Sequence, residues 1–213
     1  MPKLVRFVVG LLIVAGVLVG VARAFAIRWW RVPDDDPYLE AAIGPTLQGG
    51  DWIILWRLTP PHLGDLVLCP EPQAPDRAVI ARIAGVDGDQ VEVKGSVVTR
   101  NRRRAGTEGD CRAEEFTTAD PQTGELVTQS CDMEELGGDL HQRGNVAAGR
   151  AVPEARTQLA AGEVFLLSDN RMFPYDSREF GPAEHASCRE TVVFRVFGKS
   201  GFQDVERRLS FIR

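Results

Sequence analysis

The segment from Asp51 to Pro70 sets the pattern from which the fold is predicted. It reads Asp-Trp-Ile-Ile-Leu-Trp over residues 51–56 and Leu-Val-Leu-Cys-Pro over residues 66–70. In the first run, apolar side chains fall on both faces of a strand, and the second run stops at a proline, as strands often do. We expect the strip Trp52, Ile54 and Trp56 to pack in the core, to line an apolar groove or to touch membrane headgroups.

Short apolar runs of the same kind continue along the chain, separated by turn-forming glycines at 85, 88 and 95. They lie at residues 79–83, 91–93, 97–99, 164–167 and 192–196. Residues 101–160 are polar and weakly periodic, which indicates a β-ribbon insertion with loops. The pattern therefore predicts one mainly β domain over residues 38–213, with a variable insertion at about 101–160.

The amino-terminal segment is apolar from Phe7 to Ile27, interrupted only by Arg23. A helix needs roughly 20 apolar residues to cross a bilayer, so we predict a transmembrane anchor within residues 1–31. The pair Trp29-Trp30 that follows is typical of a membrane interface. The competing interpretation is a cleavable signal peptide, because Ala22-Arg23-Ala24 has small residues in the A-x-A arrangement. Residues 32–37 are rich in proline and aspartate and predict an extended linker.

Charge is divided unevenly between these parts. The chain has 25 Lys and Arg against 30 Asp and Glu, yet residues 1–31 contain five basic side chains and no acidic one. The remaining 20 basic and 30 acidic residues make the domain acidic, which argues against a nucleic-acid partner.

Four cysteines are compatible with an oxidising compartment. Antiparallel pairing about the turn at residues 120–124 would place Cys111 opposite Cys131, so we expect a cross-strand disulfide there. Cys69 and Cys188 lie in separate predicted strands and either pair or remain buried thiols. The cysteine spacing is unlike that of a zinc site, and we expect neither a metal nor a cofactor.

Four short motifs follow one another along the chain. They read Ala42-Ile43-Gly44-Pro45-Thr46-Leu47 with Gly50-Asp51, then Gly64-Asp65-Leu66-Val67, then Ala81-Arg82-Ile83-Ala84-Gly85 with Gly88-Asp89, and finally Ser168-Asp169-Asn170-Arg171 with Asp176-Ser177-Arg178 and Gly181. In this order they resemble the four sequence boxes of bacterial signal peptidase I, over most of the chain to about residue 199. The resemblance implies a signal-peptidase-like β-barrel or sheet domain with an inserted β-ribbon subdomain, preceded by one transmembrane helix.

In that family the first box supplies a serine nucleophile and the third a lysine general base, which works because an apolar pocket lowers the amine pKa. The resemblance puts Ala42 and Ala81 at these two positions, and alanine supplies neither group. It puts Glu40 at a position where relatives carry a hydroxyl that assists the oxyanion, and a carboxylate there repels negative charge. The resemblance also puts Pro174 at the position of a family serine and Ser168 at the position of a family glycine.

The remaining motif residues match the family, and we expect them to hold the frame of the site. They are Pro45, Thr46, Gly50, Asp51, Gly64, Asp65, Arg82, Gly85, Gly88, Asp89, Asp169, Asn170, Arg171, Asp176, Ser177 and Arg178. The resemblance implies that Arg82, Asp176 and Arg178 form one charged cluster that braces the lysine strand against the last box. Lys94 and Ser96 are the serine and lysine that lie nearest to each other in the sequence. We interpret them as a solvated pair rather than as a substitute for the catalytic dyad.

Three functions fit this pattern. The first is a catalytically inactive, membrane-anchored signal-peptidase-like protein that binds signal peptides, secreted precursors or partner proteins. The second is an active endopeptidase that cleaves signal peptides with unconventional groups, or an enzyme whose dyad was replaced by alanine. The third is a structural subunit of an envelope complex. Each places the protein in the cytoplasmic membrane as a single-pass protein with its main domain on the extracytoplasmic side.

Overall fold

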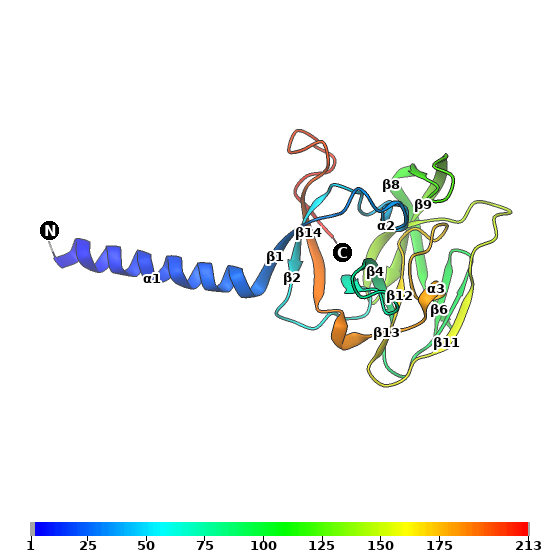
Figure 1. The fold of residues 1–213 in the computed structure, drawn as a ribbon, viewed down its shortest axis with the longest axis horizontal. Coiled ribbons are helices and arrows are strands. Elements are labelled where there is room, and N and C mark those ends of the chain that lie inside the picture. Colours follow the sequence, from blue (N-terminus) through cyan, green and yellow to red (C-terminus); the bar gives the residue numbers. More distant parts are fainter. Residues whose placement is uncertain (1–2, 213) are drawn as a thin grey trace.

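The computed structural model describes residues 3–212 as a mainly β domain from which one long helix projects (Figure 1). This confirms the predicted fold class. The helix, α1 (Lys3–Ala26), exposes apolar side chains along its length, from Val5 to Phe25. Among the residues described, no helix has both the length and the apolarity that crossing a membrane requires. The predicted transmembrane helix is therefore not found in the structure.

The main sheet has the strand order β1-β2-β14-β3-β4-β12-β13, and β15 pairs with the free part of β14. Its strands are β1 (Ile27–Arg31), β2 (Trp52–Trp56), β3 (Leu66–Pro70), β4 (Ala78–Gly85), β12 (Glu163–Leu167), β13 (Ala183–Glu184), β14 (Glu190–Phe197) and β15 (Ser210–Phe211). All the pairings within it are antiparallel.

Strand β2 shows which face of this sheet is the core. Ile53 and Leu55 are fully buried, whereas Trp52, Ile54 and Trp56 are only half-buried. The aromatic strip is therefore on the outer face, and the interpretation of it as core packing is wrong. Side chains alternate along a strand, so Ile53 and Leu55 share the core face and Trp52, Ile54 and Trp56 share the other face.

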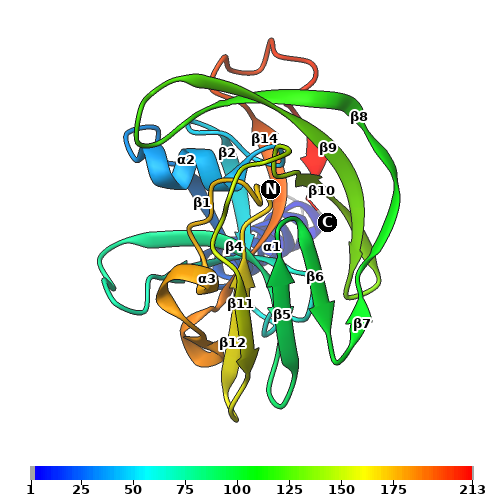
Figure 2. The ribbon, with the colours of Figure 1, turned by 90° about the vertical axis from the view of Figure 1, so that its right-hand side faces the viewer.

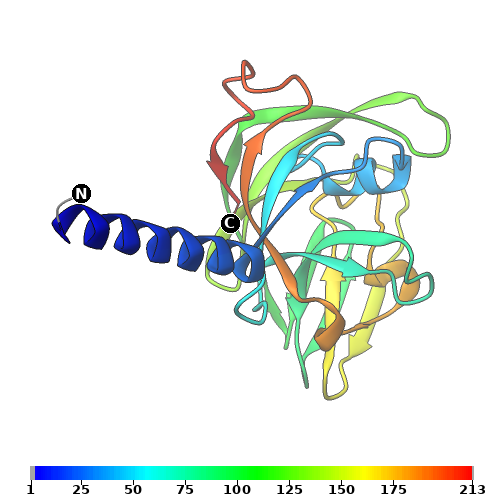
Figure 3. The same ribbon diagram turned by 60° about the vertical axis from the view of Figure 1, so that its left-hand side comes forward.

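The structure differs from the predicted boundary between anchor and domain. Residues 27–31, assigned to the anchor, form β1 and pair with β2 in the main sheet, with Trp29 opposite Ile54. Val32, in the expected linker, is fully buried, and its backbone is hydrogen-bonded to that of Asp51 and Gly50. Figure 3 shows α1 leaving the domain at this edge, beside β15 and the carboxyl-terminal end.

Two smaller sheets come from the middle of the chain. One has the order β11-β5-β6-β7, formed by β5 (Gln90–Lys94), β6 (Val97–Arg100), β7 (Arg103–Arg104) and β11 (Ala155–Gln158). The other has the order β10-β9-β8, formed by β8 (Gly106–Ala119), β9 (Leu126–Leu136) and β10 (Asp139–Gly144). The ribbon of β8 and β9 arches over the short helix α2 (Pro37–Ile43) (Figure 2).

Two further short helical turns are α3 (Ser177–Phe180), which lies within the last motif, and η1 (His185–Ser187), which follows it. All four cysteines are in disulfides. Cys111 and Cys131 join β8 to β9, with their Cα atoms 5.4 Å apart. Cys69 and Cys188 join β3 to the segment after η1, with their Cα atoms 4.6 Å apart.

Candidate functional site

The first motif begins on α2. Asp36 caps this helix by accepting hydrogen bonds from the backbone N–H groups of Tyr38 and Leu39, and Pro37 occupies its first turn, where a missing N–H costs nothing. The helix buries Leu39, Ala42 and Ile43 in the main core. Ala42, at the predicted nucleophile position, is fully buried, and its side chain is a methyl group without a reactive atom.

The third motif lies on β4, which packs against α2. Ala81, at the predicted general-base position, is fully buried opposite Val67 of β3 and belongs to the same apolar cluster as Ala42. β12 pairs with β4 only from Arg82 to Gly85. Within the described chain, the half of this edge from Ala78 to Ala81 therefore has no strand beside it.

Three motifs meet at Asp169. Its carboxylate accepts a hydrogen bond from the Thr46 hydroxyl of the first motif and two from the Arg82 guanidinium of the third, at 2.7 and 3.2 Å. Arg82 also donates to the Gly64 carbonyl of the second motif at 2.9 Å. The Asn170 backbone and side-chain amides donate to the Ala42 and Ala41 carbonyls. The four motifs, far apart in sequence, are thus joined by buried hydrogen bonds.

The predicted cluster of Arg82, Asp176 and Arg178 is not present as one unit. Arg82 pairs with Asp169, whereas Asp176 pairs with Arg178 at 2.7 Å and accepts a hydrogen bond from the Ser168 backbone N–H. Asp176 is fully buried; this burial raises its pKa, but the adjacent Arg178 guanidinium outweighs it and the pKa is lowered. Arg82 pairs with Asp169 through two hydrogen bonds, because two N–H donors of the planar guanidinium group match the two carboxylate oxygens.

The serine hydroxyl groups of the last motif accept hydrogen bonds from the backbone. Ser177 Oγ accepts from the Leu166 N–H at 2.9 Å, and Ser168 Oγ accepts from the Tyr175 N–H at 3.2 Å. The chain has lysine only at positions 3, 94 and 199. Lys94 pairs with Glu92 on the surface, and Lys199 lies 3.4 Å from Asp34.

Ser96 and Lys94 do not form a dyad. Ser96 Oγ accepts a hydrogen bond from the Val146 N–H at 2.8 Å, and its carbonyl accepts from Arg171 at 2.9 Å. Lys94 Nζ lies 2.5 Å from Glu92 Oε1. The interpretation of Lys94 as a solvated side chain agrees with this geometry.

A second ion cluster, which the sequence did not reveal, attaches the inserted sheet to the last motif. Glu134 of β9 is fully buried between Arg143 of β10 and Arg171, and His141 lies 3.3 Å from it. Burial alone would raise the pKa of Glu134, but Arg171, His141 and Arg143 outweigh it and hold the pKa at about 2. Burial, followed by the repulsion of Arg82, lowers the pKa of His141.

Apart from Arg171, this cluster lies within the insertion, which is polar and weakly periodic in the sequence. Glu134 and His141 both lie on strands of the insertion and are buried. The buried side chains of β10, His141 and Arg143, are polar, so no apolar alternation marks this strand in the sequence.

Phe116 of β8 covers the end of the first motif. A Cβ atom added to Gly44 would lie 3.1 Å from its ring, and one added to Gly144 only 2.6 Å. Gly144 in turn forms a parallel bridge with Asn170. Ala41, Met172 and Phe173 form a small apolar cluster beneath the ribbon. The inserted ribbon is therefore a wall of the site.

Glu40 lies on the ribbon side of α2. It lines a cavity of about 420 Å³ between the loop after α2, the ribbon and the carboxyl-terminal segment. Pro45, Phe116, Arg112 and Arg195 line the same cavity. Ala42 and Ala81 do not, so the structure separates this carboxylate from the two buried methyl groups.

The other motif residues shape turns around the site. Gly64 has a left-handed backbone, with φ of 91°, and a Cβ there would lie 2.3 Å from the Leu136 carbonyl oxygen. A Cβ added to Gly85 would lie 2.4 Å from a methyl carbon of Val91, so this position has no room for a side chain. Asp51, Asp65 and Asp89 each accept backbone N–H groups within their own turns, and Gly50 and Gly88 have positive φ.

Comparison with known proteins agrees with this arrangement. The family described as "Signal peptidase, peptidase S26" matches residues 4–197. Two curated proteins named signal peptidase I, from Pseudomonas fluorescens and Pseudomonas aeruginosa, are 26% and 25% identical over 178 aligned residues, and each match covers 76% of this chain. The chain spans 58% of the length of these relatives.

A solved structure, a signal peptidase I from Enterococcus faecalis V583, matches 63% of this chain and 97% of its own, at 19% identity and a TM-score of 0.37. Since the family match runs from residue 4 to residue 197, it includes all four motifs. The chain therefore belongs to the signal peptidase family, peptidase S26.

Proposed function

We propose that this protein binds signal peptides or secreted precursors in the manner of a signal peptidase but does not cleave them. The observation that carries the proposal is the pair of fully buried alanines, Ala42 and Ala81, within an intact frame of motif hydrogen bonds. We take these to be the dyad positions of the family. Peptide-bond hydrolysis by this class of enzyme needs a hydroxyl and a neutral amine there, and two methyl groups provide neither.

The β4 edge from Ala78 to Ala81 supports peptide binding. A peptide in extended form adds to a sheet where a strand edge has unpaired backbone groups. β12 leaves this half of the edge unpaired, and α2 packs beside it. We propose that the bound peptide lies here, between β4 and the loop after α2.

Photocrosslinking combined with a cleavage assay tests this function. The full chain in detergent is mixed with a preprotein that has a photoreactive residue in its signal peptide. We expect specific labelling near Ile43 to Leu47 and no cleavage product. Cleavage next to small residues would instead favour an active endopeptidase, and absence of labelling would favour a purely structural subunit.

We also propose that α1 attaches the protein to the cytoplasmic membrane, with the β domain on the extracytoplasmic side. Support comes from its exposed apolar side chains and from the exposed aromatic residues nearby, with Trp29 42% and Phe211 77% exposed. Such a surface is unusually apolar for a protein in water. Flotation of the full chain with phosphatidylcholine vesicles tests this attachment, and a protein that stays at the bottom of the gradient contradicts it.

A further inference from the structure

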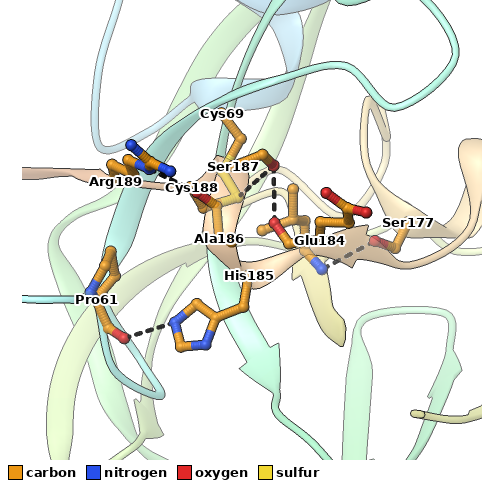
Figure 4. The surroundings of a disulfide bond; sticks show 10 residues. Pro61, Cys69, Ser177, Glu184, His185, Ala186, Ser187, Cys188 and Arg189 are labelled. Atoms are coloured by element: carbon orange, nitrogen blue, oxygen red, sulfur yellow. Dashed lines mark hydrogen bonds between the residues drawn. A yellow bond between two sulfur atoms is a disulfide. The ribbon is translucent and has the colours of Figure 1, made fainter. Parts of the chain in front are cut away.

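A second cavity lies between the loop after β2 and the turn η1, and it shares no lining residue with the cavity beside Glu40. Its volume is about 530 Å³. Leu58, Pro60 and Pro61 make its apolar wall, and Arg57 and Arg189 lie at its rim. It borders the disulfide between Cys69 and Cys188 (Figure 4).

This cavity begins where α1 ends. The backbone N–H of Arg57 donates to the carbonyl of Ala26, the last residue of α1, at 3.0 Å. Leu58, the next residue, is 59% exposed. If α1 attaches the protein to a membrane, the cavity therefore lies at the level of the lipid headgroups.

The arginines around the cavity outnumber their carboxylate partner. Arg28 and Arg57 share Glu190, at 2.8 and 3.2 Å. Arg189 donates through Nε to the Ala186 carbonyl at 2.7 Å, and within residues 3–212 it forms no ion pair. Three guanidinium groups thus surround one carboxylate, which leaves an excess of positive charge at the end of α1.

Neighbouring charges do not remove this excess. Asp87 is the one carboxylate among the residues that line this cavity, against Arg57 and Arg189. Arg57 and Arg189 also line an adjoining cavity of about 360 Å³, together with Arg28, Arg77, Asp76 and Glu190. Arg77 pairs with Asp36 and Glu71, so in this adjoining cavity Arg28, Arg57 and Arg189 face only Asp76 and Glu190, an excess of one positive charge.

We propose that Arg57 and Arg189 bind the phosphate of an anionic phospholipid, whose glycerol carbons contact Leu58 and the two prolines. A guanidinium donates two parallel hydrogen bonds to phosphate oxygens, and an apolar wall beside it suits an amphiphile better than a free ion. This inference rests on the proposed membrane attachment. It assigns a lipid site that is separate from the peptide site.

Native mass spectrometry of the full chain tests the proposal. The protein in non-ionic detergent is mixed with equal amounts of phosphatidylglycerol and phosphatidylcholine, and the bound lipids are counted. We expect a clear preference for phosphatidylglycerol. Each arginine near a membrane contributes about 1 kcal/mol toward anionic lipid, so each Arg→Gln change should lower the ratio about fivefold.

The decisive variant is Arg189→Gln, because it leaves both ion pairs of Glu190 intact. Its preference should fall, and that of Arg57→Gln with Arg189→Gln should disappear. The matched control, Arg102→Gln with Arg103→Gln, changes two exposed arginines of the inserted sheet and should keep the wild-type ratio. Glu190→Gln removes the competing carboxylate and should raise the ratio.

Three results would overturn the proposal: equal binding of both lipids by the wild type, an unchanged ratio in Arg189→Gln, or complete displacement of phosphatidylglycerol by inorganic phosphate, which would indicate a free-phosphate site. Vesicle flotation separates these from a failure of the membrane attachment itself. A chain that floats with phosphatidylcholine vesicles but shows no lipid preference contradicts only the lipid site. A chain that does not float contradicts both.

Discussion

Arg82 and Asp169 form a two-point ion pair, at 2.7 and 3.2 Å, between side chains that are each only 1% exposed. Asp169 also accepts the Thr46 hydroxyl, and Arg82 reaches the Gly64 carbonyl. This pair therefore connects all four family motifs.

Removing one partner of this pair should be costly. We expect Asp169→Asn to lower the free energy of unfolding by about 3–5 kcal/mol, because Arg82 keeps its charge in a buried place. Urea denaturation measures the change. The control is Glu92→Gln, which breaks an exposed pair with Lys94 and should change stability little. Equal effects of the two substitutions would show that the buried pair has no special structural role.

His141 should make stability depend on pH. It faces Glu134 and lies near Asp169, Arg82, Arg143 and Arg171. Its pKa is lowered in the folded state, so below the unfolded value of about 6.5 the unfolded chain binds the additional proton. The free energy of unfolding should then fall as the pH falls from about 7 toward 5.

Replacing this histidine isolates its contribution. In His141→Gln, the decrease between pH 7 and pH 5 should be smaller than in the wild type, as measured by urea denaturation at each pH. The control is His62→Gln, whose side chain is 79% exposed, and its pH dependence should match the wild type. A His141→Gln variant with the full wild-type slope would assign the effect to other groups. As the pH falls from about 4.5 toward 2, the unfolded chain protonates Glu134 while the folded chain keeps it ionised, so the free energy of unfolding should fall further.

Phe116 should restrict access to the peptide site. Its ring packs on the bare backbone of Gly44 and Gly144, so we expect Phe116→Ala to loosen the ribbon and raise the yield of signal-peptide crosslinks near Ile43 to Leu47. Stability should fall by about 1–3 kcal/mol. Phe202→Ala, at a half-exposed side chain far along the chain, is the control. An unchanged or lower yield would mean that the ribbon does not cover the binding path.

Restoring the dyad should test whether the site lost more than two side chains. We expect Ala42→Ser with Ala81→Lys to cleave a preprotein slowly, because an amine in this buried apolar cluster would have a lowered pKa and could accept the serine proton. Circular dichroism checks that the variant is folded. A folded but inert variant would indicate further loss, with Glu40 and Pro174 as the next positions to change.

The sequence predicted the positions of the motif turns well, because their causes are local. Gly64 and Gly88 have the positive φ that a tight turn requires, and Asp89 accepts the N–H of Val86 three residues earlier. The strands β2, β3 and β4 were likewise visible as apolar runs bounded by turn residues. Such features depend on a few consecutive residues, so they can be recognised without the rest of the chain.

The partners of the buried charges could not be predicted in this way. The last motif offers two aspartates to Arg82, Asp169 and Asp176. Arg82 pairs with Asp169 because β4 lies beside the strand that leads into the turn at this residue. Glu134 and His141 met Arg171 because the inserted sheet folds back across the last motif. An ion pair between distant residues depends on how sheets pack, and local patterns contain little information about that packing.

By itself, the sequence determined the mainly β fold, the four motif turns and the absence of a serine and a lysine at Ala42 and Ala81, since each follows from residue identity and short-range spacing. Only the tertiary structure decided that both alanines are sealed in one apolar cluster, that Asp169 joins the motifs, and that β1 belongs to the domain. These outcomes required strands separated by tens of residues to pair, and the buried hydrogen bonds then had one arrangement that satisfied them all.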